Sequence, residues 1–166
     1  MATARLSGTH QDAACLPPNA RLLSNGRLTT LITESGSGFT RAGDIALTRW
    51  QGDRVSDTDG WFFYLRDAET HDLWSIGAQP CAAIQDPDLQ RAAGAGSASM
   101  WLEVSAHGIL AHMEVVVHPD KDMELRSIVV SNLSGRSRLI ELTGYLEVVL
   151  ARQADEAVDP AFSRLG

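Results

Sequence analysis

Apolar and polar side chains alternate along the last third of the chain. Apolar residues take every second position in residues 109–117, and the same period returns in residues 140–150. A period of two is typical of β-strands with one buried face. Turn formers separate the runs at residues 118–120 (His-Pro-Asp) and 132–135 (Asn-Leu-Ser-Gly). Residues 114–150 therefore predict three successive antiparallel strands, a meander, and such a meander needs a second layer over its apolar face.

Each run assigns its apolar residues to one face of a strand. The residues expected on the buried faces are Ile109, Ala111, Met113, Val115 and Val117 in the first run, and Ile140, Leu142, Leu146, Val148 and Leu150 in the last.

Shorter apolar runs between Gly, Ser and Asp residues predict further strands upstream. Residues 79–97 are rich in Ala, Gly and Asp and have a weaker pattern, which is compatible with a short helix from Asp86 to Ala93. Many short strands with regularly spaced turns predict an all-β antiparallel β-sandwich. The strands are expected at residues 27–33, 39–50 (one or two strands), 61–66, 73–76 and 99–106.

Length and composition limit the domain organisation. The 166 residues, 44% hydrophobic, suffice for one domain with a core of its own. Residues 1–19 are polar and end in Pro17-Pro18, so we expect a flexible leader followed by a sandwich domain at residues 20–166. No secretory signal is visible at the N-terminus, and no apolar run approaches the roughly 20 residues of a membrane-spanning helix.

Charge and cysteine content exclude some classes of function. A net charge of −7 argues against a nucleic-acid partner, because binding to the phosphate backbone needs a basic surface. The two cysteines, Cys15 and Cys81, are too few for a disulfide framework and favour reduced thiols in the cytosol.

Motifs for hydrolysis, nucleotide binding and metal binding are weak. The sequence has no G-x-S-x-G elbow, and Gly36-Ser37-Gly38 lacks the G-K-[ST] that would complete a P-loop, so it is interpreted as a tight turn. His112, Glu114 and His118 share a strand face, but no further ligand lies within sequence reach, and an exposed polar face explains them as well. We therefore predict no metal and no cofactor.

Residues 41–53 contain the side-chain types that bind sugars. An aromatic ring packs against the C–H groups of a pyranose, and planar charged groups bind its hydroxyls. Trp50, Arg49 and Asp53 supply these types, and Arg41 adds to them. The structural alternative is a core tryptophan beside a surface arginine.

An ordered set of short motifs gives a more specific indication. Together they resemble the N-terminal β-supersandwich domain of glycoside hydrolase family 94, formerly glycosyltransferase family 36. The resemblance covers residues 22–165, and the pattern is most similar to the cyclic β-1,2-glucan synthase group. The motifs are Leu22 to Arg27 (LLSNGR), Gly36 to Arg41 (GSGFTR), Ala46 to Trp50 (ALTRW) with Asp53, Phe63 to Asp67 (FYLRD), Trp74-Ser75, Gln79-Pro80, Glu114 to Pro119 (EVVVHP), Glu124 to Arg126 (ELR), Ser131 to Ser134 (SNLS), Leu142 to Leu150 (LTGYLEVVL) and Asp159 to Ser163 (DPAFS).

The resemblance implies a non-catalytic part of an inverting phosphorylase or glucan synthase. In that family the general acid and the phosphate-binding residues lie on a separate (α/α)₆ barrel, so we expect this chain to be inactive alone. Sandwich loops help to wall the sugar site, and by motif match Arg41, Arg49, Trp50 and Asp53 are the candidate substrate-binding residues. The implied location is the cytoplasm, at the inner face of the inner membrane if the chain is part of a larger enzyme.

The implied partners are a weakly bound β-glucan or gluco-oligosaccharide and the helical barrel. A second copy of the chain is also expected, because missing strands would leave residues 139–151 as an open edge. A free-standing carbohydrate-binding module and a structural scaffold remain alternatives. The chain departs from the family at Leu28, where Tyr is frequent, and at Asp159, where His is common, and its stop at Gly166 suggests a fragment.

Overall fold

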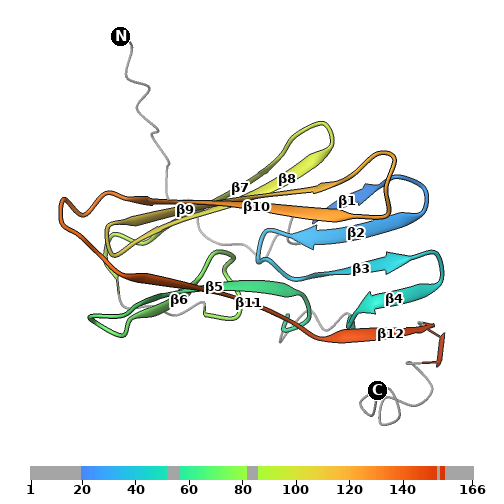
Figure 1. Cartoon of the computed structure of the whole chain (residues 1–166), viewed down its shortest axis with the longest axis horizontal. Coiled ribbons are helices and arrows are strands. Elements are labelled where there is room, and N and C mark those ends of the chain that lie inside the picture. Colours follow the sequence, from blue (N-terminus) through green and yellow to red (C-terminus); the bar gives the residue numbers. More distant parts are fainter. Residues whose placement is uncertain (1–19, 52–56, 82–85, 153, 156–166) are drawn as a thin grey trace, which may run out of the picture.

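The structure is a computed structural model that describes residues 20–51, 57–81, 86–152 and 154–155. These residues confirm the predicted all-β antiparallel fold, with twelve strands in three sheets. In Figure 1, β7 to β10 form an upper layer above β5, β6 and β11. The strands are β1 (Ala20–Ser24), β2 (Leu28–Thr33), β3 (Gly38–Ala42), β4 (Ile45–Thr48), β5 (Trp61–Asp67), β6 (Leu73–Ser75), β7 (Gln90–Ala95), β8 (Ser99–Ala106), β9 (Ile109–Val117), β10 (Glu124–Asn132), β11 (Ile140–Leu146) and β12 (Val148–Arg152).

The four-stranded sheet has the order β10-β9-β8-β7 and is a meander of consecutive antiparallel strands. On β8 and β9, alternate residues are buried as the period of two predicts. The inward face of these two strands provides Met100, Leu102, Val104, Ala106, Ile109, Ala111, Met113 and Val115, each at most 2% exposed.

The predicted meander over residues 114–150 is wrong in its third strand. β10 pairs with β9, but β11 crosses to the other layer and pairs with β5 in a three-stranded sheet of order β11-β5-β6. After Glu147, β12 joins the five-stranded sheet of order β1-β2-β3-β4-β12 by pairing with β4. Figure 1 shows β12 continuing from the end of β11.

The expected burial of the last run is wrong for three of its five residues, whereas Ile140 packs against the core and Leu146 is partly buried. Leu142, Val148 and Leu150 are 47%, 58% and 68% exposed. They lie on β11 and β12, each of which pairs with a single neighbour and ends its sheet. Because no described strand lies beyond them, the alternation gives the strand conformation correctly but not the burial.

Two further elements differ from the sequence-based expectation. β1 was not predicted, and residues 86–93 do not form a helix, because β7 occupies Gln90–Ala95 and pairs with β8. Gly94 lies opposite Trp101, and a Cβ at Gly94 would stand 2.6 Å from the indole ring. Cross-strand packing therefore overrides the helix propensity of an Ala-rich segment.

The core joins all three sheets between the two layers. Leu23 and Ile32 come from the five-stranded sheet, and Leu65 and Trp74 from the three-stranded sheet; they meet the inward residues of β8 and β9. In the described part of the chain, no helix has the length and hydropathy needed to cross a membrane.

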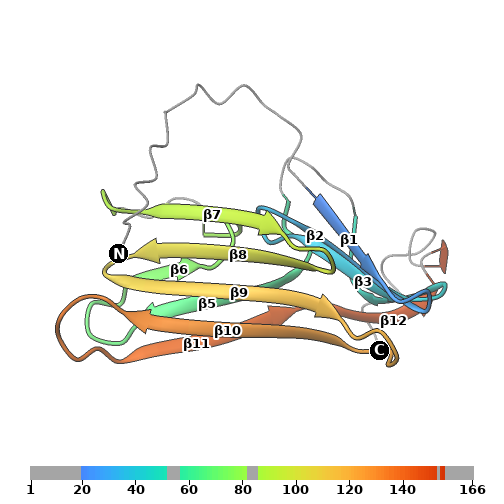
Figure 2. The same ribbon diagram turned by 90° about the horizontal axis from the view of Figure 1, so that it is seen from above.

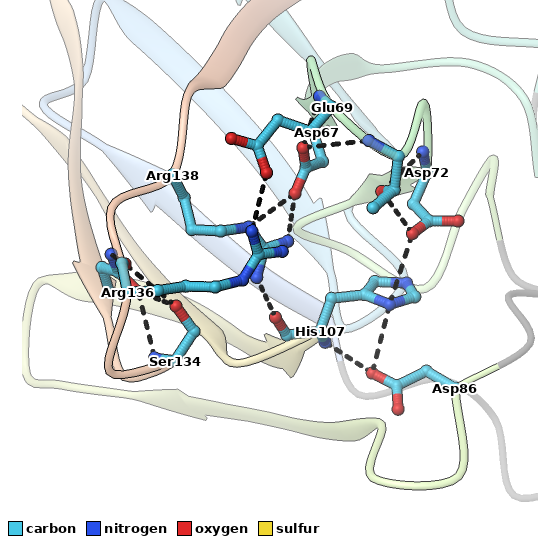
Figure 3. A network of polar contacts seen from close by, with 10 residues as sticks. Asp67, Glu69, Asp72, Asp86, His107, Ser134, Arg136 and Arg138 are labelled. Carbon is cyan, nitrogen blue, oxygen red and sulfur yellow. Dashed lines mark hydrogen bonds and ion pairs between the residues drawn. The ribbon is translucent and has the colours of Figure 1, made fainter.

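A polar network fixes the crossover between the layers (Figure 3). Arg138, just before β11, pairs with the fully buried carboxylate of Asp67 at the end of β5, and its Nη1 donates to the His107 carbonyl at 2.9 Å. Hydrogen bonds from the Arg138 side chain and from the Glu69 backbone lower the pKa of Asp67 to about 2. The crossover segment is thus held against the β5–β6 turn and the β8–β9 turn together.

Candidate functional site

Arg41 and Trp50 both contact the Phe39 side chain. The Phe39 and Trp50 rings meet edge to face with centroids 5.7 Å apart, and the Arg41 guanidinium carbon lies 5.5 Å from the Phe39 ring centroid. Phe39 and Arg41 are two residues apart on β3 and therefore project from one face. We refer to Phe39, Arg41 and Trp50 as the aromatic–arginine surface.

The local sequence explains how this surface forms. β3 and β4 form a tight hairpin in which Ala42 pairs with Ile45 and Gly43 has a φ of +60°, a left-handed conformation that suits glycine. The return along β4 brings Trp50 back beside Phe39. Arg41 is exposed, while Phe39 and Trp50 are partly buried, so the surface combines one free guanidinium with two partly open rings.

Arg49 is directed elsewhere. Its side chain is 8% exposed and pairs with Glu147 at 3.2 Å, and its backbone N–H donates to the Glu147 carbonyl at 3.1 Å. Glu147 is the residue between β11 and β12, so Arg49 ties the end of β4 to the point where the long strand changes sheets. These contacts hold the buried Arg49 side chain beside the aromatic–arginine surface.

The structure therefore brings only two of the four candidate residues to one surface. Arg41 and Trp50 share a surface, Arg49 is buried next to it, and Asp53 lies outside the described residues. Phe39, which links Arg41 and Trp50, was not among the candidate residues. Its spacing of two from Arg41 was the available signal, since strand residues two apart share a face.

A cavity of about 280 Å³ opens between the five-stranded sheet and the start of β10. Glu124 lines it and accepts hydrogen bonds from Thr30 and Thr40, the former at 2.7 Å. The lining residues are Leu28, Thr40, Leu47, Thr48, Trp61, Asp122, Glu124, Leu146, Val148 and Leu150.

The carboxylate of Glu124 also pairs with a buried arginine. Arg126 Nε donates to Glu124 at 2.6 Å, with 5% and 6% of the two side chains exposed, and Arg126 Nη1 donates to the Trp61 carbonyl at 2.7 Å. Burial lowers the pKa of Arg126, and the neighbouring carboxylate opposes that shift. Both oxygens of Glu124 are engaged, so this group orients its neighbours and is not a free acid or base.

Sequence reasoning did not single out Glu124 and Arg126. Their signal was present, because they share the parity of Ile128 on β10, the face that looks toward the core. A charged pair on the apolar parity of a strand indicates a buried ion pair.

The residues considered for zinc make other contacts. His112 Nδ1 lies 3.1 Å from Glu103, and His118 Nδ1 accepts the backbone N–H of Asp120 at 3.0 Å. Within the described ranges, His, Cys, Asp and Glu side chains form no group of three or more that could hold a metal ion.

The antiparallel strands in three sheets define the class of protein, an all-β sandwich domain. Residues 6–166 match the family described as Glycosyl hydrolase 94, supersandwich domain. The match covers most of the chain, and the chain belongs to this family, which confirms the resemblance found in the sequence.

Three relatives agree with this assignment. The chain is 33% identical over 144 residues to the cyclic beta-(1,2)-glucan synthase NdvB of Rhizobium meliloti (strain 1021), a match that covers 87% of the chain and 5% of that protein. It is 25% identical to the N,N'-diacetylchitobiose phosphorylase of Vibrio furnissii, over 84% of the chain and 18% of the relative. For the N,N'-diacetylchitobiose phosphorylase of Vibrio proteolyticus, the identity is 26% over 78% of the chain and 16% of the relative. The chain thus spans less than a fifth of each of these proteins.

Proposed function

We propose that this chain is a non-catalytic sandwich domain that helps to form the sugar site of a β-glucan-processing phosphorylase or synthase. The observation that carries the proposal is the convergence of Arg41 and Trp50 on Phe39, which presents rings and a guanidinium together. The named activities of the relatives, glucan synthesis and chitobiose phosphorolysis, support a β-linked sugar as the ligand. The proposed location is the cytoplasmic side of the inner membrane, within a larger enzyme.

The chemistry of the aromatic–arginine surface suits a pyranose. A ring such as that of Trp50 packs against the C–H face of a sugar, and the exposed Arg41 guanidinium donates to hydroxyls in one plane. A surface open on one side encloses only part of its ligand. We therefore expect the isolated domain to bind with a dissociation constant in the millimolar range, which corresponds to a binding free energy of about −4 kcal/mol.

Titration with β-1,2-gluco-oligosaccharides tests this proposal, with the NMR chemical shifts of the backbone and indole N–H groups as the readout. The expected shifts gather at Phe39, Arg41 and Trp50, and Trp50→Ala abolishes them. Trp101→Ala is the matched control, because Trp101 stacks on His112 in the four-stranded sheet and should leave the titration unchanged. Saturable shifts that survive Trp50→Ala would contradict the assignment.

We further propose that the domain packs on a helical barrel next to this surface. Val148 and Leu150 are 58% and 68% exposed and lie on the strand that Arg49 contacts through Glu147. An exposed apolar surface of this kind is typical of docking sites. Co-elution with a helical-barrel domain of the family should weaken with Leu150→Asp and remain with Leu73→Asp, a control residue that is 47% exposed on β6. Equal loss with both variants would contradict this placement.

A second candidate function is that of a free-standing carbohydrate-binding module. The observation that favours it is the cavity of about 280 Å³, which the Trp61 side chain lines. The same titration separates the two candidates, since binding in the cavity would shift Trp61 and Thr40 and leave Trp50 unaffected.

A further inference from the structure

The rings of Phe39 and Trp50 lie beyond the paired part of the β3–β4 hairpin. The register between these strands pairs residues 41 and 42 with residues 46 and 45, next to the turn. Phe39 is the second residue of β3, and Trp50 follows the last residue of β4 by two positions. Contacts outside this register must therefore hold the two rings edge to face.

Asp59 connects the backbone segments next to these two rings. Its carboxylate accepts a hydrogen bond from the Gln51 N–H at 2.5 Å, and Gln51 directly follows Trp50. Its carbonyl accepts a hydrogen bond from the Gly38 N–H at 3.0 Å, and Gly38 directly precedes Phe39. A single residue thus links the segment that carries one ring to the segment that carries the other.

The backbone around Asp59 is itself anchored to the β2–β3 turn. The Asp57 carboxylate accepts hydrogen bonds from the hydroxyls of Ser35 and Ser37, and Ser37 is fully buried. Gly60 packs so closely against the same turn that a Cβ there would lie 3.0 Å from the Ser37 Cα. In Figure 1 and Figure 2, β5 begins near this turn. Asp59 lies between these two anchors, so it is held in place independently of the aromatic rings.

The hydrogen bond from Gln51 to Asp59 is suited to fixing a position. A carboxylate acceptor makes this bond stronger than one between neutral groups. Gln51 is exposed and Asp59 is partly buried, so water would hydrate the Gln51 N–H if the carboxylate were removed. Because no buried donor would be left unsatisfied, the loss should free the residue after Trp50 and change the stability of the fold little.

We propose that Asp59 is a positioning residue of the aromatic–arginine surface, which keeps the Trp50 ring edge to face with Phe39 before a sugar binds. Its effect on sugar binding rests on the proposed function, which assigns a β-linked sugar to this surface. A ring that must first be ordered binds its ligand about two- to tenfold more weakly than a ring already in place. Asp59 thus acts on the ligand through Trp50 and not by direct contact.

Nuclear Overhauser cross-peaks between the ring protons of Phe39 and Trp50 measure this role in the sugar-free chain. Asp59→Ala should remove the cross-peaks, and Asp59→Asn, which keeps an acceptor oxygen, should retain them. Asp44→Ala is the matched control, because it removes the same charge beside the β3–β4 turn. Asp44 pairs with Arg152 at 3.4 Å, with both side chains largely exposed, so its loss should leave the cross-peaks unchanged.

A second ring pair in the same chain shows whether Asp59→Ala acts locally. The rings of Trp101 and His112 stack with centroids 5.7 Å apart, and their cross-peaks should persist in this variant. Loss at both ring pairs would mean that the substitution loosens the whole domain, and it would overturn the positioning role.

Titration of the same variants with β-1,2-gluco-oligosaccharides separates this inference from the proposed function. If both hold, Asp59→Ala raises the dissociation constant about two- to tenfold, while Asp59→Asn and Asp44→Ala leave it near the wild-type value. If the wild-type chain binds no sugar but Asp59→Ala loses the cross-peaks between Phe39 and Trp50, the proposed function fails and the positioning of the rings stands. Cross-peaks that persist in Asp59→Ala overturn the inference, whatever the affinity for sugar.

Amide hydrogen exchange of the wild-type chain provides a criterion that does not depend on a folded variant. The Gln51 N–H should exchange slowly although Gln51 is exposed, because the Asp59 carboxylate accepts its hydrogen bond. Rapid exchange at Gln51 would show that Asp59 does not hold this segment, and it would overturn the proposal even if Asp59→Ala failed to fold.

Discussion

Arg138 and Asp67 are 71 residues apart in the sequence and form an ion pair with 5% and 0% of their side chains exposed. Arg138 Nε donates to the Asp67 carboxylate at 2.7 Å. The pair lies where the chain leaves the four-stranded sheet for the three-stranded one (Figure 3). It therefore joins the crossover to the strand that β11 must pair with.

Arg138→Ala should destabilise the fold strongly. The substitution leaves the Asp67 carboxylate buried without its cation, which costs more than the intact pair contributes. Arg136→Ala is the matched control, because Arg136 pairs with Glu69 in an ion pair more than half exposed on both sides, worth about 0–1 kcal/mol. Urea unfolding of both variants measures the difference, and equal effects would show that the crossover does not depend on Arg138.

Asp67 should also make stability depend on pH in the acid range. Its pKa is about 2 in the folded chain against a usual value of 3.8, so between these values the unfolded state binds more protons. The contribution to stability is therefore complete above about pH 4 and is lost as the pH falls toward 2. Urea unfolding at pH 5, 3.5 and 2.5 should show that the free energy of unfolding of Asp67→Asn, lower than that of the wild type at pH 5, approaches the wild-type value as the pH falls. A difference that stays constant over this range would contradict this assignment.

The buried pair of Glu124 and Arg126 should behave non-additively. Glu124→Ala removes the acceptor of Arg126, Thr30 and Thr40 and leaves a buried guanidinium, at a cost of roughly 3–5 kcal/mol. Replacing both residues, in Glu124→Ala with Arg126→Met, should recover part of this loss, because no uncompensated charge remains. Denaturant unfolding of the two single variants and the double variant forms the cycle. Additive effects would indicate that the two side chains are not coupled.

The chain alone should show no phosphorolysis. The proposal assigns the reacting groups to a barrel and only a wall of the sugar site to this domain. Incubation with β-1,2- or β-1,4-gluco-oligosaccharides and phosphate should release no glucose 1-phosphate. Release that co-purifies with the chain and disappears with Trp50→Ala would place catalysis in the sandwich itself.

The local sequence was sufficient to predict most of the strands, although not β1 or β7, and it predicted burial in β8 and β9. Residues 109–117 alternate, and Ile109, Ala111, Met113 and Val115 are all buried as expected. The ordered motifs were sufficient for the family, which the match over residues 6–166 confirms. Both inferences succeed because strand periodicity and motif order are properties of neighbouring residues.

Part of the candidate site could be read from the sequence and part could not. Residue types and motif match pointed to Arg41 and Trp50, which the structure brings to one surface. They did not include Phe39, whose spacing from Arg41 was the only signal, and they gave no reason to direct Arg49 toward Glu147. Those positions depend on where the β3–β4 hairpin meets the long strand of β11 and β12. Because these segments are far apart in the sequence, no pattern among neighbouring residues predicts their contact.

Tertiary structure alone decided the partners of the strands. The alternation in residues 140–150 is the same whether the strand continues a meander or crosses to the other layer, and only the pairing of β11 with β5 separates the two. The same period of two cannot tell a covered face from an open one, so Leu142, Val148 and Leu150 were expected inside and are exposed. A strand's own sequence fixes which side chains share a face, whereas the rest of the fold decides what lies against that face and beside that edge.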